Sequence, residues 1–116
     1  GIMGRLAVVP MVLEARGLDV TPGMIEIFRK AGLDDAVEAL QIIYGEEVGH
    51  VAYGSKWFHF LCGRDGIDPK PEFHRLVRHY FHSQLKPPFN EEKRAEAGIP
   101  PDFYWPLAEE TPVAKR

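Results

Sequence analysis

Glu47 and His50 stand three residues apart in the stretch from Leu40 to Leu61, LQIIYGEEVGHVAYGSKWFHFL. At about 100° per residue, this stretch forms an amphipathic helix with Glu47 in the middle of its apolar stripe and His50 at the edge of that stripe. A carboxylate is costly to bury unless it is paired or bound to a cation. Side chains three residues apart on a helix reach one point beside it. A carboxylate oxygen and an imidazole nitrogen that converge inside a helical bundle are ligands of di-iron and di-manganese sites.

A Glu-x-x-His sequence also arises by chance in many helices, and an inward glutamate can instead pair with an arginine. The metal interpretation therefore needs a second carboxylate at a matching level on a neighbouring helix. Glu14 is the candidate, because a helix from about Arg5 to Gly17 places it in the middle of another apolar face.

The elements that position these side chains follow from breakers and caps. Pro10 predicts a kink in the first helix or a helix that begins there. The stretch 17–22 predicts an interruption, with Gly17 as a C-cap, Thr21 as the next N-cap and Pro22 at the first helical position. The second helix then covers 22–31 and ends at Gly32. We expect Asp35 to cap the long helix in a capping box with Glu38, and the helix to stop near 62–63.

Glu14 and Glu47 are 33 residues apart, and the midpoint between them falls just before the breaker Gly32. In a helix hairpin, two residues equidistant from the reversal lie at the same height, here roughly 24 Å from the turn. The spacing therefore predicts two inward glutamates at one level, with His50 beside them.

The rest of the chain predicts a further helix over 71–82 and then a change in composition. Lys86 to Asn90 is a proline-containing spacer, Asn90 caps a short helix closed by Gly98, and an extended Pro-rich tail follows. We expect the aromatic cluster 103–105 either to dock this tail on a surface or to stay mobile. The predicted organisation is thus all-α, with a helical half-bundle plus an extra helix in 1–85 and a Pro-rich tail with one short helix in 86–116.

Composition narrows the function classes. A net charge of −3 at pH 7 gives no electrostatic case for general nucleic-acid binding. The single cysteine, Cys62, cannot form an internal disulfide, so a reducing, cytoplasmic location is expected. No apolar run approaches the length of a membrane span. A small basic patch is the one feature that suits an RNA partner, and it comprises His74, Arg75, Arg78, His79 and Lys86.

Three strings carry a resemblance: VPMVLEARGLDVTPGMIEIF, IIYGEEVGHVAYGSKWF, and LKPPFNEEKRAEAG with PDFY. Over about residues 3–105, the chain resembles the C-terminal half of a bacterial ferritin-like family catalogued as a domain of unknown function. That family is distantly similar to the non-haem di-iron hydroxylase that modifies tRNA. The resemblance implies that Glu14, Glu47 and His50 are metal ligands in two helices of a four-helix bundle.

The resemblance also implies a missing half, because full-length relatives carry another helix pair with a matching Glu and Glu-x-x-His. Three ligands do not satisfy two irons. Either two copies associate, or the chain is a fragment without a competent site. A lone hairpin leaves its apolar face exposed, so we predict a homodimer.

Three function hypotheses follow from the sequence. The first is a carboxylate-bridged di-metal protein, with iron favoured over manganese or zinc, acting in O₂-dependent oxidation or hydroxylation. In it Glu47 or Glu14 bridges the metals, His50 supplies a nitrogen, and Tyr44 and Arg16 are candidates to hydrogen-bond the ligand carboxylates. The second is a non-catalytic helical interaction module, in which Glu14 and Glu47 pair with Arg or Lys. The third is RNA modification or binding through the basic patch. The sequence does not reveal a substrate.

Overall fold

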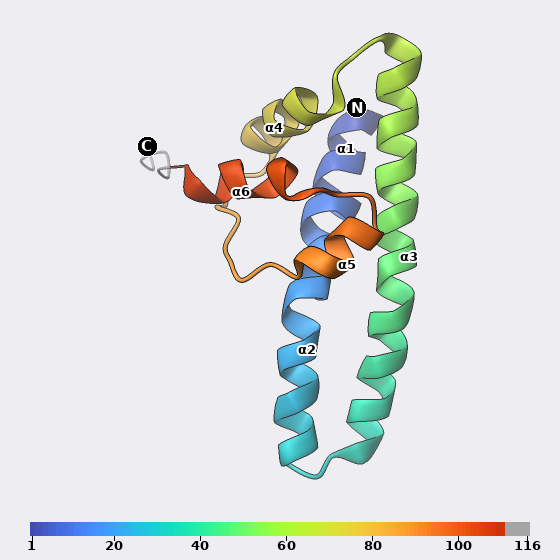
Figure 1. The fold of residues 1–116 in the computed structure, drawn as a ribbon, viewed down its shortest axis with the longest axis vertical. Helices are drawn as coiled ribbons and strands as arrows, with labels where there is room; N and C mark the ends of the chain where they lie inside the picture. Colours follow the sequence, from blue (N-terminus) through green and yellow to red (C-terminus); the bar gives the residue numbers. More distant parts are fainter. Residues whose placement is uncertain (111–116) are drawn as a thin grey trace.

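A computed structural model describes residues 1–110 of the chain. These residues are helical wherever they are regular, and no strand occurs among them. The first half forms a helix hairpin, seen lengthwise in Figure 1. One arm is a continuous helical rod built from α1 (Ile2–Val8), the π-helical segment η1 (Val9–Glu14) and α2 (Ala15–Lys30). The other arm is the long helix α3 (Asp34–Asp65).

The predicted interruption at 17–22 is wrong, because α2 runs through Gly17 and Pro22 without a break. Pro22 has no N–H to donate to the carbonyl of Leu18, four residues earlier. The Asn90 side-chain amide donates to that oxygen instead, at 3.0 Å. Thr21 is not a cap but a buried residue inside α2. A hydrogen bond from far along the chain therefore offsets part of the cost of the proline.

The reversal between the arms confirms the predicted breaker at Gly32. Gly32 has a φ of +73°, and the amide of Leu33 donates to the carbonyl of Phe28 at 3.0 Å. This six-residue return is a Schellman motif, which glycine permits because it has no Cβ. The expected Asp35 capping box is wrong, since Leu33 is the N-cap of α3 and makes no side-chain capping bond. Asp34 and Asp35 lie in the first helical turn, where the helix dipole favours acidic side chains.

The long helix continues past the expected stop at 62–63 and ends at Asp65, before the turn at Gly66. Helix α4 (Pro69–Tyr80) starts two residues before the predicted 71–82 helix, because the Asp68 carboxylate caps it by accepting from the amide of Lys70. Helix α4 packs on α1. The cap at Asn90 is confirmed, and it opens the short helix α5 (Glu91–Glu96).

The C-terminal tail is not extended over its described part. Residues Pro101–Glu109 form helix α6, which lies beside α4 (Figure 1). Its aromatic residues Phe103 and Tyr104 are buried, so the docking alternative for this cluster is the one observed. Proline fits the first helical turn, as at Pro101, and the buried aromatic rings favour helix for the residues that follow. Residues 111–116, the end of the predicted tail, lie outside the described part.

One hydrophobic core joins the hairpin to the C-terminal segment. It includes Met11, Val51 and Phe58 from the hairpin, and Ile99 and Tyr104 from the C-terminal segment. No helix in the described range is both long enough and apolar enough to cross a membrane.

A buried ion pair fixes the C-terminal segment to α2. The Arg94 guanidinium donates from Nε to Oδ1 of Asp19 at 2.9 Å and from Nη2 to Oδ2 at 2.6 Å, and both side chains are almost fully buried. The same guanidinium lies over the rings of Phe89 and Tyr104. Planar stacking and a bidentate carboxylate are the two interactions that arginine makes and lysine cannot.

Candidate metal centre

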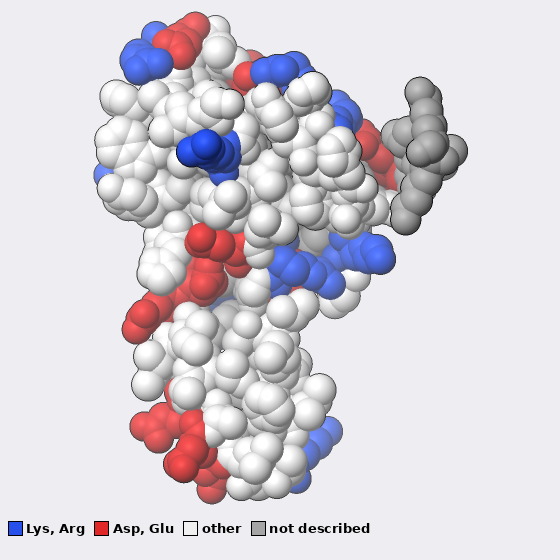
Figure 2. All heavy atoms as spheres, turned by 180° about the vertical axis from the view of Figure 1, so that it is seen from behind, with Lys and Arg blue, Asp and Glu red and all other residues white. Residues whose placement is uncertain are grey.

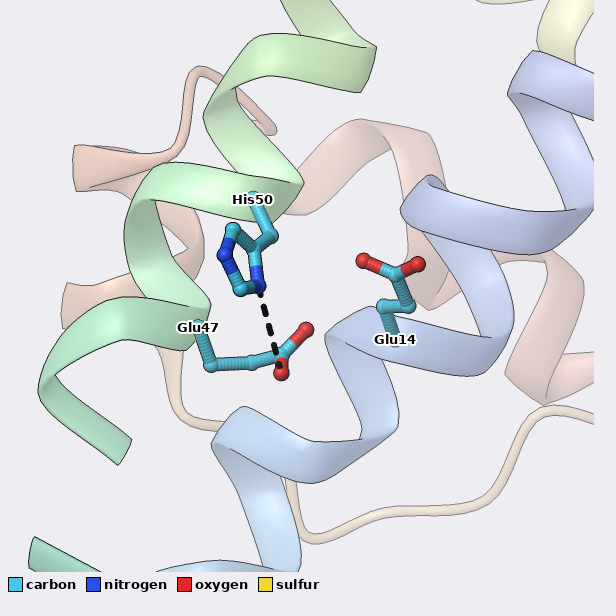
Figure 3. Close-up of side chains that lie close together, drawn as sticks. All are labelled: Glu14, Glu47 and His50. Atoms are coloured by element: carbon cyan, nitrogen blue, oxygen red, sulfur yellow. Dashed lines mark ion pairs between the residues drawn. The ribbon is translucent and has the colours of Figure 1, made fainter. Parts of the chain in front are cut away.

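The structure brings Glu14, Glu47 and His50 together between the two arms of the hairpin, as the spacing predicts (Figure 3). Each offers a ligand atom, and the three atoms lie within 4.8 Å of one another. Glu14 is the last residue of η1, whereas Glu47 and His50 come from successive turns of α3. Nδ1 of His50 lies 4.0 Å from Oε2 of Glu47. Their role as metal ligands remains a prediction.

The position of Glu14 depends on the π-helical segment around Pro10. The backbone amide of Ala15 donates to the carbonyl of Pro10, five residues earlier, which is the π-helical pattern. A π-helical turn inserts one extra residue, so side chains after it are rotated relative to those before it. Such turns often occur at functional sites. The sequence indicated an irregularity at Pro10, but not that the helix accommodates it by widening.

Close contact between the arms sets the width of the site. A Cβ atom added to Gly54, one turn after His50, would lie 2.3 Å from Cγ of Pro10. Any larger residue there would force the helices apart. On the other side of the site, a Cβ at Gly17 would make an ordinary contact with Cγ of Glu47 at 3.8 Å. Glycine at 54 therefore lets α3 approach the rod closely enough for the ligands to meet.

Glu47 lacks a protein partner for part of its charge. Its side chain is 21% exposed. Its Oε1 atom is buried and accepts no hydrogen bond from the described residues. Burial raises the pKa of Glu47 above its ordinary value, the nearby Glu14 carboxylate raises it further, and His50 opposes the shift. A buried carboxylate oxygen facing a second carboxylate is energetically unfavourable unless a proton or a cation lies between them.

The site opens into a groove of about 660 Å³, lined by Leu6, Pro10, Glu14, Glu47, His50, Tyr53 and Gly54. His50 is the most accessible of the three candidate ligands, with 62% of its side chain exposed. Figure 2, which views the molecule from behind, shows acidic atoms gathered on one side of the region where the molecule narrows and basic atoms on the other side. The groove thus combines a polar floor with apolar walls.

Tyr44 and Arg16, the candidates to hydrogen-bond the ligands, have other partners. The hydroxyl of Tyr44 accepts from the Asn90 amide at 2.7 Å. Arg16 donates to the backbone carbonyl of Lys86 at 2.6 Å and lies 3.5 Å from the Asp19 carboxylate. Both side chains therefore tie the C-terminal segment to the helices that carry the site.

Asn90 has two roles beyond the helix cap that its sequence position predicts. It caps α5, bonds the Leu18 carbonyl that Pro22 leaves free, and holds Tyr44, one turn before Glu47. The cap could be read from the sequence, and the proline in α2 was the signal that a carbonyl needed another donor.

The basic patch is partly neutralised. Arg75 pairs with Glu72, and Arg78 pairs with Glu110. His74 uses Nε2 to reach the backbone carbonyls of Asp102 and Phe103, which joins α4 to α6. Three of the five residues of the patch therefore have structural partners.

The fold and the site define an all-helical protein with a carboxylate–imidazole cluster between two antiparallel helices. The family model described as "Protein of unknown function (DUF455)" matches residues 1–105, and the chain belongs to this family. An uncharacterized protein of Haemophilus influenzae is 40% identical to it over 98 residues, which cover 84% of this chain and 34% of the relative. The chain thus spans about a third of the length of this curated relative. No solved structure matches the chain.

Proposed function

We propose that the chain carries half of a carboxylate-bridged di-metal site of the ferritin-like type, loaded with iron and used for O₂-dependent oxidation or hydroxylation. The observation that carries this proposal is the buried Oε1 of Glu47, which has no hydrogen-bond partner among the described residues. It shares its site with a second carboxylate and an imidazole. A divalent cation would neutralise both carboxylates and would give that oxygen a positively charged partner.

The donor set fits the proposed metal. Metal–ligand distances to carboxylate and imidazole are about 2.0–2.2 Å, so ligand atoms around one ion lie at most roughly 4.4 Å apart. The three candidate atoms lie within 4.8 Å, and small side-chain rotations suffice to close this difference. Mixed oxygen and imidazole ligands suit iron or manganese, and zinc binds such sites as a substitute.

Each ligand has a distinct part in this proposal. Glu14 or Glu47 would bridge two ions, the other carboxylate would be a terminal ligand, and His50 would supply the nitrogen. When bound, iron supplies the redox chemistry with O₂. The apolar walls at Leu6, Pro10 and Gly54 restrict water on one side of the ligands. The two helical arms that carry Glu14 and Glu47 hold the carboxylates at a fixed spacing in this partly dry groove.

The interaction-module alternative requires Glu14 and Glu47 to pair with Arg or Lys. Within residues 1–110, no such pair involves either glutamate, and the one ion pair of Glu47 is with His50. Arg16, the nearest arginine in sequence, contacts the 86–88 segment instead. The carboxylates therefore lack the neutralising partners that a purely structural role would call for, which favours the metal proposal.

Metal analysis of Glu47→Gln beside Glu46→Gln tests the proposal. Glu46 is the exposed neighbour of Glu47, so its variant removes the same charge outside the site. The wild-type protein and Glu46→Gln are expected to bind iron(II) under anaerobic conditions. Glu47→Gln and His50→Ala should each lose more than about tenfold in affinity. A wild-type protein that binds no more iron than Glu47→Gln contradicts the proposal.

Oxygen consumption then separates storage or structural binding from catalysis. Iron(II)-loaded protein should consume O₂ faster than the same concentration of free iron(II) in the same buffer, and the Glu47→Gln protein should not. Equal rates for the two proteins would contradict the oxidase part of the proposal while leaving metal binding intact.

A further inference from the structure

The side chain of Asn90 joins the two arms of the hairpin. One hydrogen of its amide goes to the backbone carbonyl of Leu18 in α2 at 3.0 Å, and the other goes to the hydroxyl of Tyr44 in α3 at 2.7 Å. Its carbonyl oxygen accepts from the backbone amide of Lys93 at 3.1 Å, which fixes the orientation of the side-chain amide. Both amide hydrogens are therefore in use, one on each arm. We call this connection from Leu18 through Asn90 to Tyr44 the Asn90 bridge.

The helix cap alone does not require asparagine at this position. A cap needs only an acceptor oxygen, which serine, threonine or aspartate also supplies. The two amide donors go beyond that need, and those other cap residues lack them. The backbone also holds Asn90 in place, because its own amide donates to the buried carboxylate of Asp19 at 2.8 Å. The Asn90 bridge is thus held at a fixed position between the arms.

The bridge contacts each arm one helical turn from a candidate ligand. Leu18 follows Glu14 by four residues, which is about one turn of α2. Tyr44 precedes Glu47 by three residues, which is about one turn of α3. Because the arms are antiparallel, both contacts lie on the side of the site that faces the hairpin turn. Glu47 also approaches the rod there, since a Cβ at Gly17 would lie 3.8 Å from its Cγ.

A second contact between the arms lies on the opposite side of the site. There the ring of Pro10 packs against the backbone at Gly54. Pro10 lies about one turn before Glu14. Gly54 lies one turn after His50. Among the described residues, no side-chain hydrogen bond runs directly from the rod to α3, so the Asn90 bridge supplies the polar connection between them. The candidate ligands therefore lie between an apolar contact on one side and the bridge on the other.

We propose that Asn90 is a positioning residue for the candidate metal site and that its bridge sets the distance between Glu14 and Glu47. The inference rests on the proposed metal function, and it adds a residue that touches none of the candidate ligands. A metal site binds tightly when its ligands are held at the distances that the ion requires, and the groups that orient those ligands contribute to the affinity. Loss of the bridge should therefore weaken metal binding even where the protein stays fully folded.

Anaerobic calorimetric titration of the full chain with iron(II) sulfate tests this. Asn90→Ser keeps a cap for α5 but removes both amide donors, and it should bind iron(II) about three- to thirtyfold more weakly than the wild type. Tyr44→Phe removes only the contact with α3 and should also weaken binding. Because both substitutions break the same bridge, the double variant should lose less affinity than the product of the two single losses.

Val77→Ala is the matched control for stability. Val77 is buried in α4 and takes no part in the bridge, so truncating it weakens the fold by leaving a cavity away from the site. The Val77→Ala protein should bind iron(II) within about twofold of the wild type. All titrations are made at a temperature where circular dichroism shows every variant fully folded.

The outcomes separate the bridge from the metal function. An Asn90→Ser protein that binds iron(II) as tightly as the wild type overturns the positioning role and leaves the metal function standing. An equal loss of affinity in Val77→Ala also overturns the positioning role, because the affinity would then follow stability alone. A wild-type chain that binds no iron(II) contradicts the metal function itself, and the positioning role falls with it.

Discussion

At the scale of single residues, Glu47 holds its carboxylate in surroundings that disfavour a negative charge. It is buried enough to raise its pKa, and its close neighbours are a second carboxylate and an exposed imidazole. Such a cost is expected where a side chain serves binding or chemistry rather than stability.

The metal-free protein should therefore be less stable than Glu47→Gln above the acid range. The unfolded pKa of Glu47 is near 4.5, and the folded pKa is higher. The folded state binds more protons at this position, so the wild type loses stability relative to the variant as the pH rises from about 4.5 through the folded pKa. Above that range the difference should be constant. Urea unfolding in chelator across this pH series measures it, and a flat or opposite trend contradicts the assigned burial.

At the scale of elements, the site depends on how closely two helices approach. The irregular turn around Pro10 and the absence of a side chain at Gly54 occur at the same contact. The two features are 44 residues apart in sequence, yet they act as one unit. The two arms are in close contact one turn beyond His50, which helps to bring the ligands of both arms within reach of one point.

Gly54→Ala should destabilise the protein by about 1–3 kcal/mol, because the new methyl group would overlap the Pro10 ring. It should also weaken metal binding by widening the site. Gly49→Ala on the same helix is the control. A Cβ there meets nothing within 4 Å, so the substitution should stabilise the helix by up to about 1 kcal/mol. Urea unfolding of both variants decides the matter, and Gly54→Ala as stable as Gly49→Ala would show that the helices are not held this closely.

At the scale of the whole molecule, the C-terminal segment holds one side of the hairpin. The Asp19–Arg94 pair is the buried anchor of this arrangement, and Asn90 is its second fixed point. The segment reaches α2 within two turns of Glu14 and reaches α3 one turn before Glu47. The C-terminal segment therefore supports both helices that flank the site.

Arg94→Met should destabilise the protein by about 3–5 kcal/mol, because it leaves the buried Asp19 carboxylate without its partner. Asp19→Leu combined with Arg94→Met should recover part of this loss by removing the stranded charge. Arg78→Met, which breaks the exposed pair with Glu110, should cost less than about 1 kcal/mol. Equal losses for the Arg94 and Arg78 variants in urea unfolding would contradict the anchoring role.

The sequence by itself determined the register of the site. Gly32 fixes where the chain turns, helix rise is constant, and the turn is nearly equidistant from Glu14 and Glu47, so these side chains had to meet at one level. The cap at Asn90 was equally local and equally predictable. Only the tertiary structure decided that α2 continues through Pro22, that the helix widens around Pro10, and that 101–109 is helical. In these places the deciding contacts come from distant parts of the chain, such as the amide of Asn90 on the carbonyl of Leu18, and local propensity carries no information about them.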